Sequence, residues 1–469
     1  MRTQYGGGLI ALSFNAIEIT NALIVIVLFY VIYRRQDAGS LLWVLFFYCT
    51  LHFSFAIYPL FSSAHTLLLG NLHLQGSGWL AKISALSLLI CVFYLLGGHA
   101  YATYSQSLVS EKRVVNCILA GMIAVFGGYM FNLRPGDLLQ LKNTVSIEAM
   151  LFLLMIGFLG LRGRQGSDKM DVHFWIVPGL GILSLIVCVS VFEVVSHRSW
   201  AGTLETSGAM VYRASATLFN PNLLGIWASL VYLGGAFHMF ASKKDQKLMM
   251  LVMILTSCAI YFTGSRSAIL LLMLALIVAF MMTIVVTREK LRWVPLAILP
   301  MTVISIYASV HWLIIPFVAD TVGWHEIELL ALRFAATPKY LVYYGLMVIG
   351  YEVQIPVEIA ISMEGRLIGG AGDGGWITLY SDIGWLGMIG ILGLWLLALC
   401  RGLISCFSNH YIANVYALSV LCYCLLIGLV MRFQIFPVWV LISIVLTPCL
   451  LHWVPQVPIS TRSKPVRND

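Results

Sequence analysis

Long apolar runs recur along the whole chain and limit its fold more strongly than any other feature. The runs are about 17–22 residues long, which is the length that an α-helix needs to cross the hydrocarbon core of a bilayer. Of the 469 residues, 60% are hydrophobic and 10% are charged. A soluble globular domain averages roughly 25% charged residues. The sequence therefore predicts an all-α polytopic membrane protein.

The apolar runs predict twelve or thirteen transmembrane helices. The expected spans are 17–33, 41–61, 83–101, 114–131, 145–161, 172–195, 223–240, 248–263, 268–287, 293–317, 377–400 and 413–430, with 438–453 as a thirteenth. The first run continues into Arg34 and Arg35 without a small-residue cleavage site. We therefore do not expect a cleaved signal peptide.

Lysine and arginine gather at every second turn between the runs. The clusters are 34–35, 112–113, 162–169, 243–247, 288–292, Arg401, and Arg462, Lys464 and Arg467 in the tail. The positive-inside rule assigns such clusters to the cytoplasm. The pattern predicts a cytoplasmic C-terminus and, with thirteen spans, an outer N-terminus. The net charge of +8 then reflects membrane topology, and no nucleic-acid partner is expected.

One long segment between the tenth and eleventh runs carries many charged and aromatic residues and cannot lie within a bilayer. It spans residues 318–375 and is too rich in apolar side chains for a disordered segment. Loops longer than about 12–15 residues in compact proteins are usually functional or disordered. We expect a folded, partly helical outer loop over an active site. It separates N-terminal membrane helices (1–317) from C-terminal membrane helices (376–453) and a cytoplasmic tail (454–469).

The ten cysteines lie inside apolar runs or beside a cytoplasmic turn, without the spacing of metal ligands. Neither a disulfide nor a metal site is expected from them, and no cofactor is predicted.

Arg266 stands between two strongly apolar runs, at the expected outer boundary of the membrane. An arginine costs about 2.5–3.5 kcal/mol at the centre of a membrane helix on insertion scales, and less at an interface. Gly264 and Ser265 before it predict a tight turn that opens the next helix. Free N–H groups at a helix start, together with a guanidinium, form a good anion site. The alternative is an arginine that extends to a lipid headgroup phosphate.

Other cations lie near the same expected face. Arg213 precedes Asn220-Pro221-Asn222, where either asparagine is predicted to cap the next helix and Pro221 to occupy its first turn. Arg333 in the outer loop is a candidate second half of a pyrophosphate clamp, or an ordinary surface arginine. Lys339 and Arg366 are candidates of the same kind.

Candidate bases lie near a glycine-rich stretch, residues 369–375. Asp373 lies within it and Trp376 directly follows. Asp382 lies deeper in the next apolar run, where an ionisable group is a functional candidate or satisfies a polar group of a neighbouring helix. The histidines His311 and His325 are further candidate bases, although a lone histidine is more often structural.

Four features in this order resemble the O-antigen polymerase (Wzy-type) and O-antigen ligase superfamily of bacterial inner-membrane glycosyltransferases. They are Asn-Pro-Asn at the head of one helix, Gly-Ser-Arg-Ser-Ala in a hairpin two helices later, a large outer loop, and Gly-Trp-Leu-Gly at 384–387. The resemblance is best over residues 213–390 and is only topological elsewhere.

The resemblance implies a C-type glycosyltransferase fold and a metal-independent, inverting reaction at the periplasmic face. The donor would be an oligosaccharide on undecaprenyl diphosphate, and an acceptor sugar hydroxyl would attack the anomeric carbon. Arg266 matches the hairpin arginine of the family, and Arg333 is the match for its loop arginine. Membrane lipid and a chain-length regulator protein are the further partners that we expect.

Ligases of the family carry a His-Asn pair where this chain has Asp373-Gly374, which favours a polymerase over a ligase. Asp373, Arg266 and Arg333 are therefore the predicted catalytic residues. The predicted substrate-binding residues are Arg213, Asn222, Lys339, Arg366, Asp382 and Trp376. Outer aromatic residues, Trp376 among them, would pack on sugar faces or in the core of the loop.

Two other classes of protein remain as alternatives. A transporter or flippase would favour charges along the middle of the bundle and broken helices in symmetric halves, whereas the charges noted within runs are Glu18, Glu148 and Asp382. An accessory protein of a polysaccharide complex would need no pair of arginines. An Arg266→Lys variant separates these readings, because lysine keeps the charge without the fork of donors.

Overall fold

The structure, a computed structural model, describes a set of separate ranges of the chain. These are residues 22–52, 68–69, 72–73, 79–105, 107, 109–132, 138–162, 172–196, 205–207, 211–214, 216–218, 221–241, 246–286, 375–409, 412–430 and 436–453. Within these ranges the protein is helical apart from two short β-ribbons.

The helices follow the apolar runs of the sequence. They are Ala22–Arg34, α2 (Ala38–His52), α4 (Trp79–Tyr104), α5 (Val109–Phe131), α6 (Leu138–Arg162), α7 (Val172–Ser196), α8 (Pro221–Ala241), α9 (Gln246–Thr263), α10 (Arg266–Val286), α15 (Gly375–Asn409), α16 (Ile412–Val430) and α17 (Phe436–Trp453). In the described ranges, eight helices are long and apolar enough to cross a membrane, and four shorter ones are also apolar.

This architecture is consistent with the polytopic membrane protein that the sequence predicts. Each expected span overlaps a described helix except 293–317, which lies outside the described residues. The outer loop 318–375 also lies outside them, apart from Gly375. The direction in which the bundle faces stays a prediction from the basic clusters.

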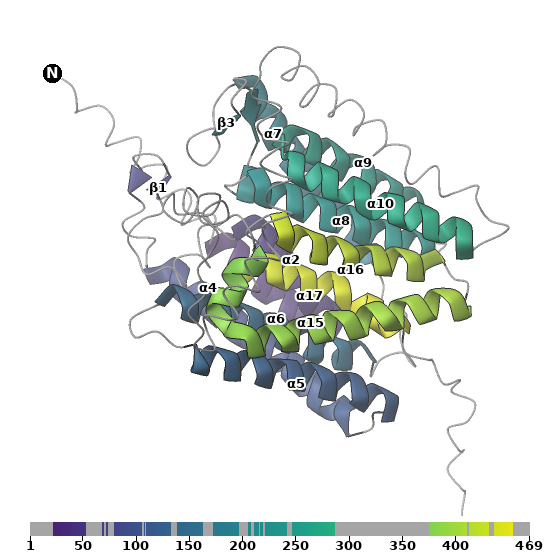
Figure 1. Ribbon diagram of the computed structural model, residues 1–469. Helices are drawn as coiled ribbons and strands as arrows, with labels where there is room; N and C mark the ends of the chain where they lie inside the picture. Colours follow the sequence, from purple (N-terminus) through teal and green to yellow (C-terminus); the bar gives the residue numbers. More distant parts are fainter. Residues whose placement is uncertain are drawn as a thin grey trace, which may run out of the picture.

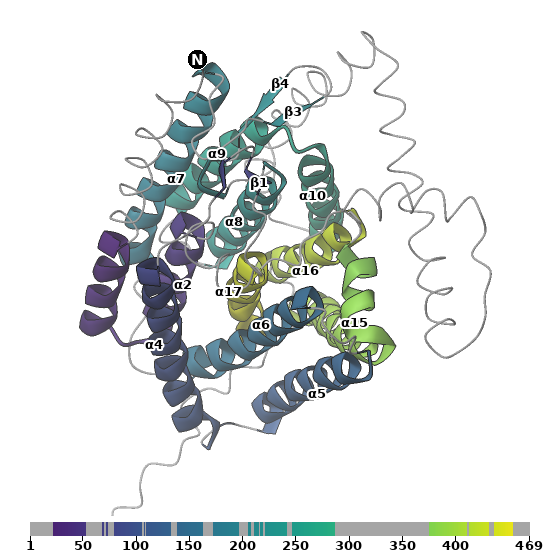
Figure 2. The same cartoon turned by 90° about the vertical axis from the view of Figure 1, so that its left-hand side faces the viewer.

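The helices form one bundle in which segments far apart in the sequence pack side by side. The pairs α5 with α15, α6 with α17 and α8 with α9 are in extensive contact. Helix α16 lies between α10 and α15 and contacts both (Figure 2). In Figure 1, α10 and α15 both run from left to right, so their first residues lie at the same end of the bundle. We call this the β3 end, and the opposite end the Arg401 end.

The β3 end carries a short ribbon between the expected spans 172–195 and 223–240. Strands β3 (Glu205–Ser207) and β4 (Val211–Arg213) pair antiparallel, with Glu205 opposite Arg213. A single 3-10 turn, η2 (Ala216–Leu218), then leads to α8. A second ribbon joins β1 (Leu68–Leu69) to β2 (Leu72–His73). The first ribbon places Arg213 directly over the bundle.

Helices α5 and α15 approach each other through small residues, which we call the glycine contact. Its members are Gly121, Ala124 and Gly128 on α5, and Gly384, Gly387 and Gly390 on α15. A Cβ on Gly128 would overlap the backbone of Ile383 and Gly387, and a Cβ on Gly390 would lie 2.5 Å from that of Ala124. Small residues permit close backbone approach where no hydrophobic effect drives helices together.

Helix α15 bends within the glycine contact. Gly384 has φ 62° and ψ −171°, a conformation that glycine adopts without the steric cost of a side chain. A side-chain carbon there would lie 3.5 Å from Cγ of Asn132, at the end of α5. The bend therefore lies against the last turn of α5, toward the β3 end.

A buried ion pair closes the opposite end of α5 and α6. Glu111 and Arg162 pair there with side chains only 6% and 7% exposed. Arg162 belongs to a basic cluster that the sequence predicts to be cytoplasmic, and in the structure it pairs with a buried carboxylate. Removing one partner of a buried, hydrogen-bonded charge pair strongly destabilises the protein, because the other charge is left buried and unpaired.

Candidate functional site

Four residues at the β3 end join β4, α8 and the turn between α9 and α10, and we call them the Arg213 junction. They are Arg213, Asn222, Thr263 and Ser265. Nε of Arg213 donates to the carbonyl oxygen of Thr263 (3.0 Å), and Nη2 donates to Oδ1 of Asn222 (2.7 Å). The same Oδ1 accepts from Oγ of Ser265 at 3.1 Å. One carboxamide thus binds both the arginine and the start of α10.

The chain on either side of Arg213 is fixed to the same turn. The backbone N–H of Ala214 donates to the carbonyl oxygen of Phe262 at 2.9 Å. Together with the Arg213 bond to Thr263, this contact attaches β4 to the last turn of α9. The guanidinium is therefore held by backbone and side-chain contacts on more than one element, which limits how far it can move.

The turn between α9 and α10 forms as the sequence predicts. Gly264 has φ 55°, and the N–H of Ser265 donates to Oγ1 of Thr263 at 3.0 Å. The carbonyl of Ser265 accepts from the N–H of Ile269 (3.1 Å), so Ser265 occupies the N-cap of α10. Arg266 is the first residue of that helix, and its side chain lies outside the described residues.

Helix α8 lies very close to the start of α10. A Cβ on Gly225 would lie 2.8 Å from Cβ of Ala268 and 3.0 Å from Cβ of Ser265. The absence of a side chain at Gly225 lets the two helices approach, and this brings Asn222, one turn earlier on α8, within reach of Ser265.

Asn222 has a different local role from the predicted one. Pro221 is the first residue of α8, as expected. Asn222 is therefore the second helical residue and does not occupy the cap position, and its side-chain oxygen serves Arg213 and Ser265 instead. Asn220, the other predicted cap, lies outside the described residues.

Glu193 near the end of α7 is a buried acidic residue that is not among the residues predicted from the sequence. Its side chain is fully buried, and Oε2 accepts from the backbone N–H of Ala216 at 2.8 Å. Ala216 has φ 45°, which is unusual for a residue with a side chain. A carboxylate two residues before the end of the apolar run 172–195 was the available signal. The contact fixes the segment between Arg213 and α8 to α7.

Two further predicted residues lie in the part of α15 that precedes its bend at Gly384. Trp376 is 4% exposed, and its Nε1 donates to the carbonyl oxygen of Leu425 in α16 at 2.8 Å. Asp382 is 5% exposed and lies two residues before Gly384. Backbone groups at a helix break within a membrane are tolerated where protein or water satisfies them. The start of α15, with Trp376 and Asp382, is therefore a second region with polar side chains at the β3 end, in addition to the Arg213 junction.

The structure thus brings together some of the predicted residues. Arg213 and Asn222 are in direct contact beside the start of α10, and Asp382 and Trp376 lie on α15, with α16 between the two helices. The other predicted site residues lie outside the described part of the chain: Arg333, Lys339, Arg366 and Asp373, with His311 and His325. Within the described ranges, no three His, Cys, Asp or Glu side chains gather as they would around a metal ion.

Three comparisons with known proteins found no relative of this chain. No family model matches the chain, and neither the curated proteins nor the solved structures contain a significant match.

Proposed function

We propose that this protein is a membrane glycosyltransferase that polymerises oligosaccharide repeat units carried on undecaprenyl diphosphate. The reaction would take place at the periplasmic face of a bacterial inner membrane and supply O-antigen, capsule or exopolysaccharide. The β3 end of the bundle would then be the periplasmic end, in agreement with the alternation of basic clusters.

The Arg213 junction is the observation that carries the proposal. Arg213 is held by Thr263 and Asn222, and Asn222 in turn binds Ser265, the residue directly before Arg266. Two arginine positions therefore flank one fixed polar cluster at the start of a membrane helix. Helix N–H groups and guanidinium groups both stabilise phosphate oxygens. The proposed donor presents such an anion, a diphosphate ester.

The chemistry needs two kinds of group. A bond forms between the acceptor oxygen and the anomeric carbon while the bond from that carbon to the diphosphate oxygen breaks. The leaving diphosphate takes the electron pair, and preorganised cations such as Arg266 with Arg333 stabilise the developing charge. The acceptor proton passes to a carboxylate. Asp373 is the proposed base.

The experiment is a polymer assay in a strain that lacks this gene, complemented with variant proteins at verified membrane levels. Wild type restores long glycan, whereas Arg266→Ala, Arg333→Ala and Asp373→Asn leave single repeat units. We expect losses of about 100-fold or more for each, the usual effect of removing one stabilising donor or the base. Lys247→Ala, an exposed position at the start of α9, is the matched control and retains full polymer.

Two outcomes would change the assignment. If the deletion strain accumulates full-length polymer that stays on the lipid carrier, the protein is a ligase that transfers glycan to lipid A-core. If all three variants restore normal polymer, the proposed active site is wrong and a transporter becomes the better explanation.

A further inference from the structure

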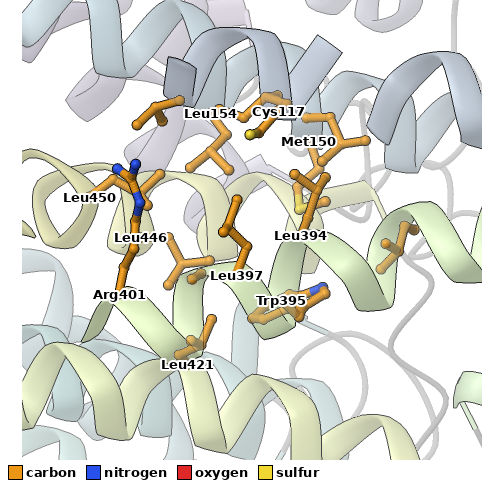
Figure 3. A pocket seen from close by; sticks show the side chains of 15 residues that line it. Cys117, Met150, Leu154, Leu394, Trp395, Leu397, Arg401, Leu421, Leu446 and Leu450 are labelled. Carbon is orange, nitrogen blue, oxygen red and sulfur yellow. The ribbon is translucent and has the colours of Figure 1, made fainter. Parts of the chain in front are cut away.

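An apolar pocket lies toward the Arg401 end of the bundle, away from the Arg213 junction. It is lined by α5, α6, α15, α16 and α17, and its empty space is about 830 Å³ including the part that opens outward. Figure 3 places Arg401 at one edge, beside Leu450, with Trp395 and Leu394 farther along the hollow. The volume that counts as a cavity within this space is about 80 Å³.

The lining has the composition of a site for a lipid chain with an anionic end. Among the fifteen described residues that line the pocket, Arg401 carries the only charge, and the others are apolar except for Cys117. Leu397 of the lining is 40% exposed, so the hollow reaches the surface of the bundle that faces lipid. A polar ligand would find almost no hydrogen-bonding partner along this lining other than Arg401.

Charge at the mouth selects the headgroup. Arg113 is exposed and directly precedes Val114 of the lining, so a second cation lies near the same end of α5. Basic pockets between membrane helices bind anionic lipid headgroups, and each lysine or arginine near the membrane surface adds attraction. The nearby Arg162 is already paired with Glu111.

We infer that this pocket binds one acyl chain of an anionic glycerophospholipid, with the lipid phosphate at the Arg401 guanidinium. The acyl chain lies along Leu394, Leu397 and Trp395. It fills the space between α5 and α15 on the Arg401 side of the glycine contact. The inference does not depend on the proposed glycosyltransferase chemistry, because the two locations lie at opposite ends of the bundle.

Cys117 in the wall of the pocket provides the test. The purified protein is reconstituted in phosphatidylcholine nanodiscs, with or without phosphatidylglycerol, and treated with N-ethylmaleimide. Peptide mass spectrometry then follows labelling at Cys117 and at Cys188, an exposed cysteine of α7. Phosphatidylglycerol should slow the labelling of Cys117 about fivefold, the effect expected of one arginine–lipid contact. Labelling of Cys188 should not change.

Two variants connect the protection to the guanidinium and to the pocket. Arg401→Gln should remove the effect of phosphatidylglycerol, whereas Lys247→Gln on α9 should retain it. Ala398→Phe, which fills the hollow, should slow Cys117 labelling in both lipids. Equal Cys117 rates in the two lipids, or an unchanged lipid effect in Arg401→Gln, would overturn the inference. Stronger protection by undecaprenyl phosphate than by phosphatidylglycerol would also overturn it, by assigning the pocket to the polyprenyl donor.

Discussion

The Arg213 junction and the glycine contact both hold helices together near a bend, but by opposite means. Polar groups hold the junction through directional bonds of 2.7–3.1 Å. In the glycine contact the absence of side chains lets two backbones touch. A glycine with positive φ stands at each location: Gly264 between Thr263 and Ser265 of the junction, and Gly384 within the glycine contact. The comparison teaches that small residues suffice where two backbones must approach, whereas a charged side chain is held in one position only by several directional polar contacts.

The largest effect is expected at the glycine contact, from Gly128→Leu. The new side chain would meet backbone atoms of Ile383 and Gly387, which cannot swing away as a side chain can. Overpacking in a well-packed core typically costs about 1–3 kcal/mol and sometimes more, and we expect about 3 kcal/mol or more here. The measurement is the amount of folded protein in detergent extracts, followed by its Tm.

Gly393→Leu is the matched control for this change. It adds the same side chain to α15, at a glycine that has no atom within 4 Å of a built Cβ. We expect a Tm close to that of wild type. Equal losses in the two variants would mean that the close approach of α5 and α15 does not matter for stability.

A smaller effect is expected at the Arg213 junction, from Arg213→Lys. Lysine keeps the charge but cannot reproduce the planar fork that reaches Thr263 and Asn222 together. A buried polar partner left unsatisfied costs about 1–3 kcal/mol, which should appear as a lower Tm. Under the proposed function, polymer should also fall about 100-fold.

Arg34→Lys provides the baseline for that substitution. Arg34 is exposed and its Nε donates to the hydroxyl of Tyr30. Surface substitutions usually stay within about 0.5 kcal/mol, so Tm and polymer should both match wild type. If Arg213→Lys also matches wild type in Tm and polymer, the guanidinium fork matters for neither stability nor activity, and the proposed function loses its main support.

The smallest effect is expected from Ser265→Ala. Oδ1 of Asn222 loses one donor but keeps Arg213, so the cost should be about 0.5–1.5 kcal/mol, that of one ordinary hydrogen bond. Combining Ser265→Ala with Arg213→Lys tests whether the two donors are coupled through Asn222. Residues that share a partner show coupling of about 0.5–3 kcal/mol. Strict additivity of the two Tm changes would mean that they act independently.

Local features of the sequence predicted much of this protein. Run lengths located the helices because about 20 apolar residues suffice to cross a bilayer. Turn chemistry placed Gly264 and Ser265 before α10 and made Pro221 the first residue of α8. These features depend only on residues close together in the chain. Of the predicted catalytic residues, Arg266 begins α10, whereas Arg333 and Asp373 lie outside the described residues and stay predictions.

Other features were decided only by the tertiary structure. The carbonyl of Thr263 is 50 residues away from Arg213, which donates to it, and Oε2 of Glu193 accepts from a backbone N–H 23 residues later. Gly128 gains its importance only because α15 lies against it, and Arg401 borders a pocket only because five helices converge there. The length of an apolar run indicates a membrane helix but not which partner that helix meets. Lipid tails are as apolar as leucine, so the choice of partners depends on close packing and a few polar contacts between distant residues.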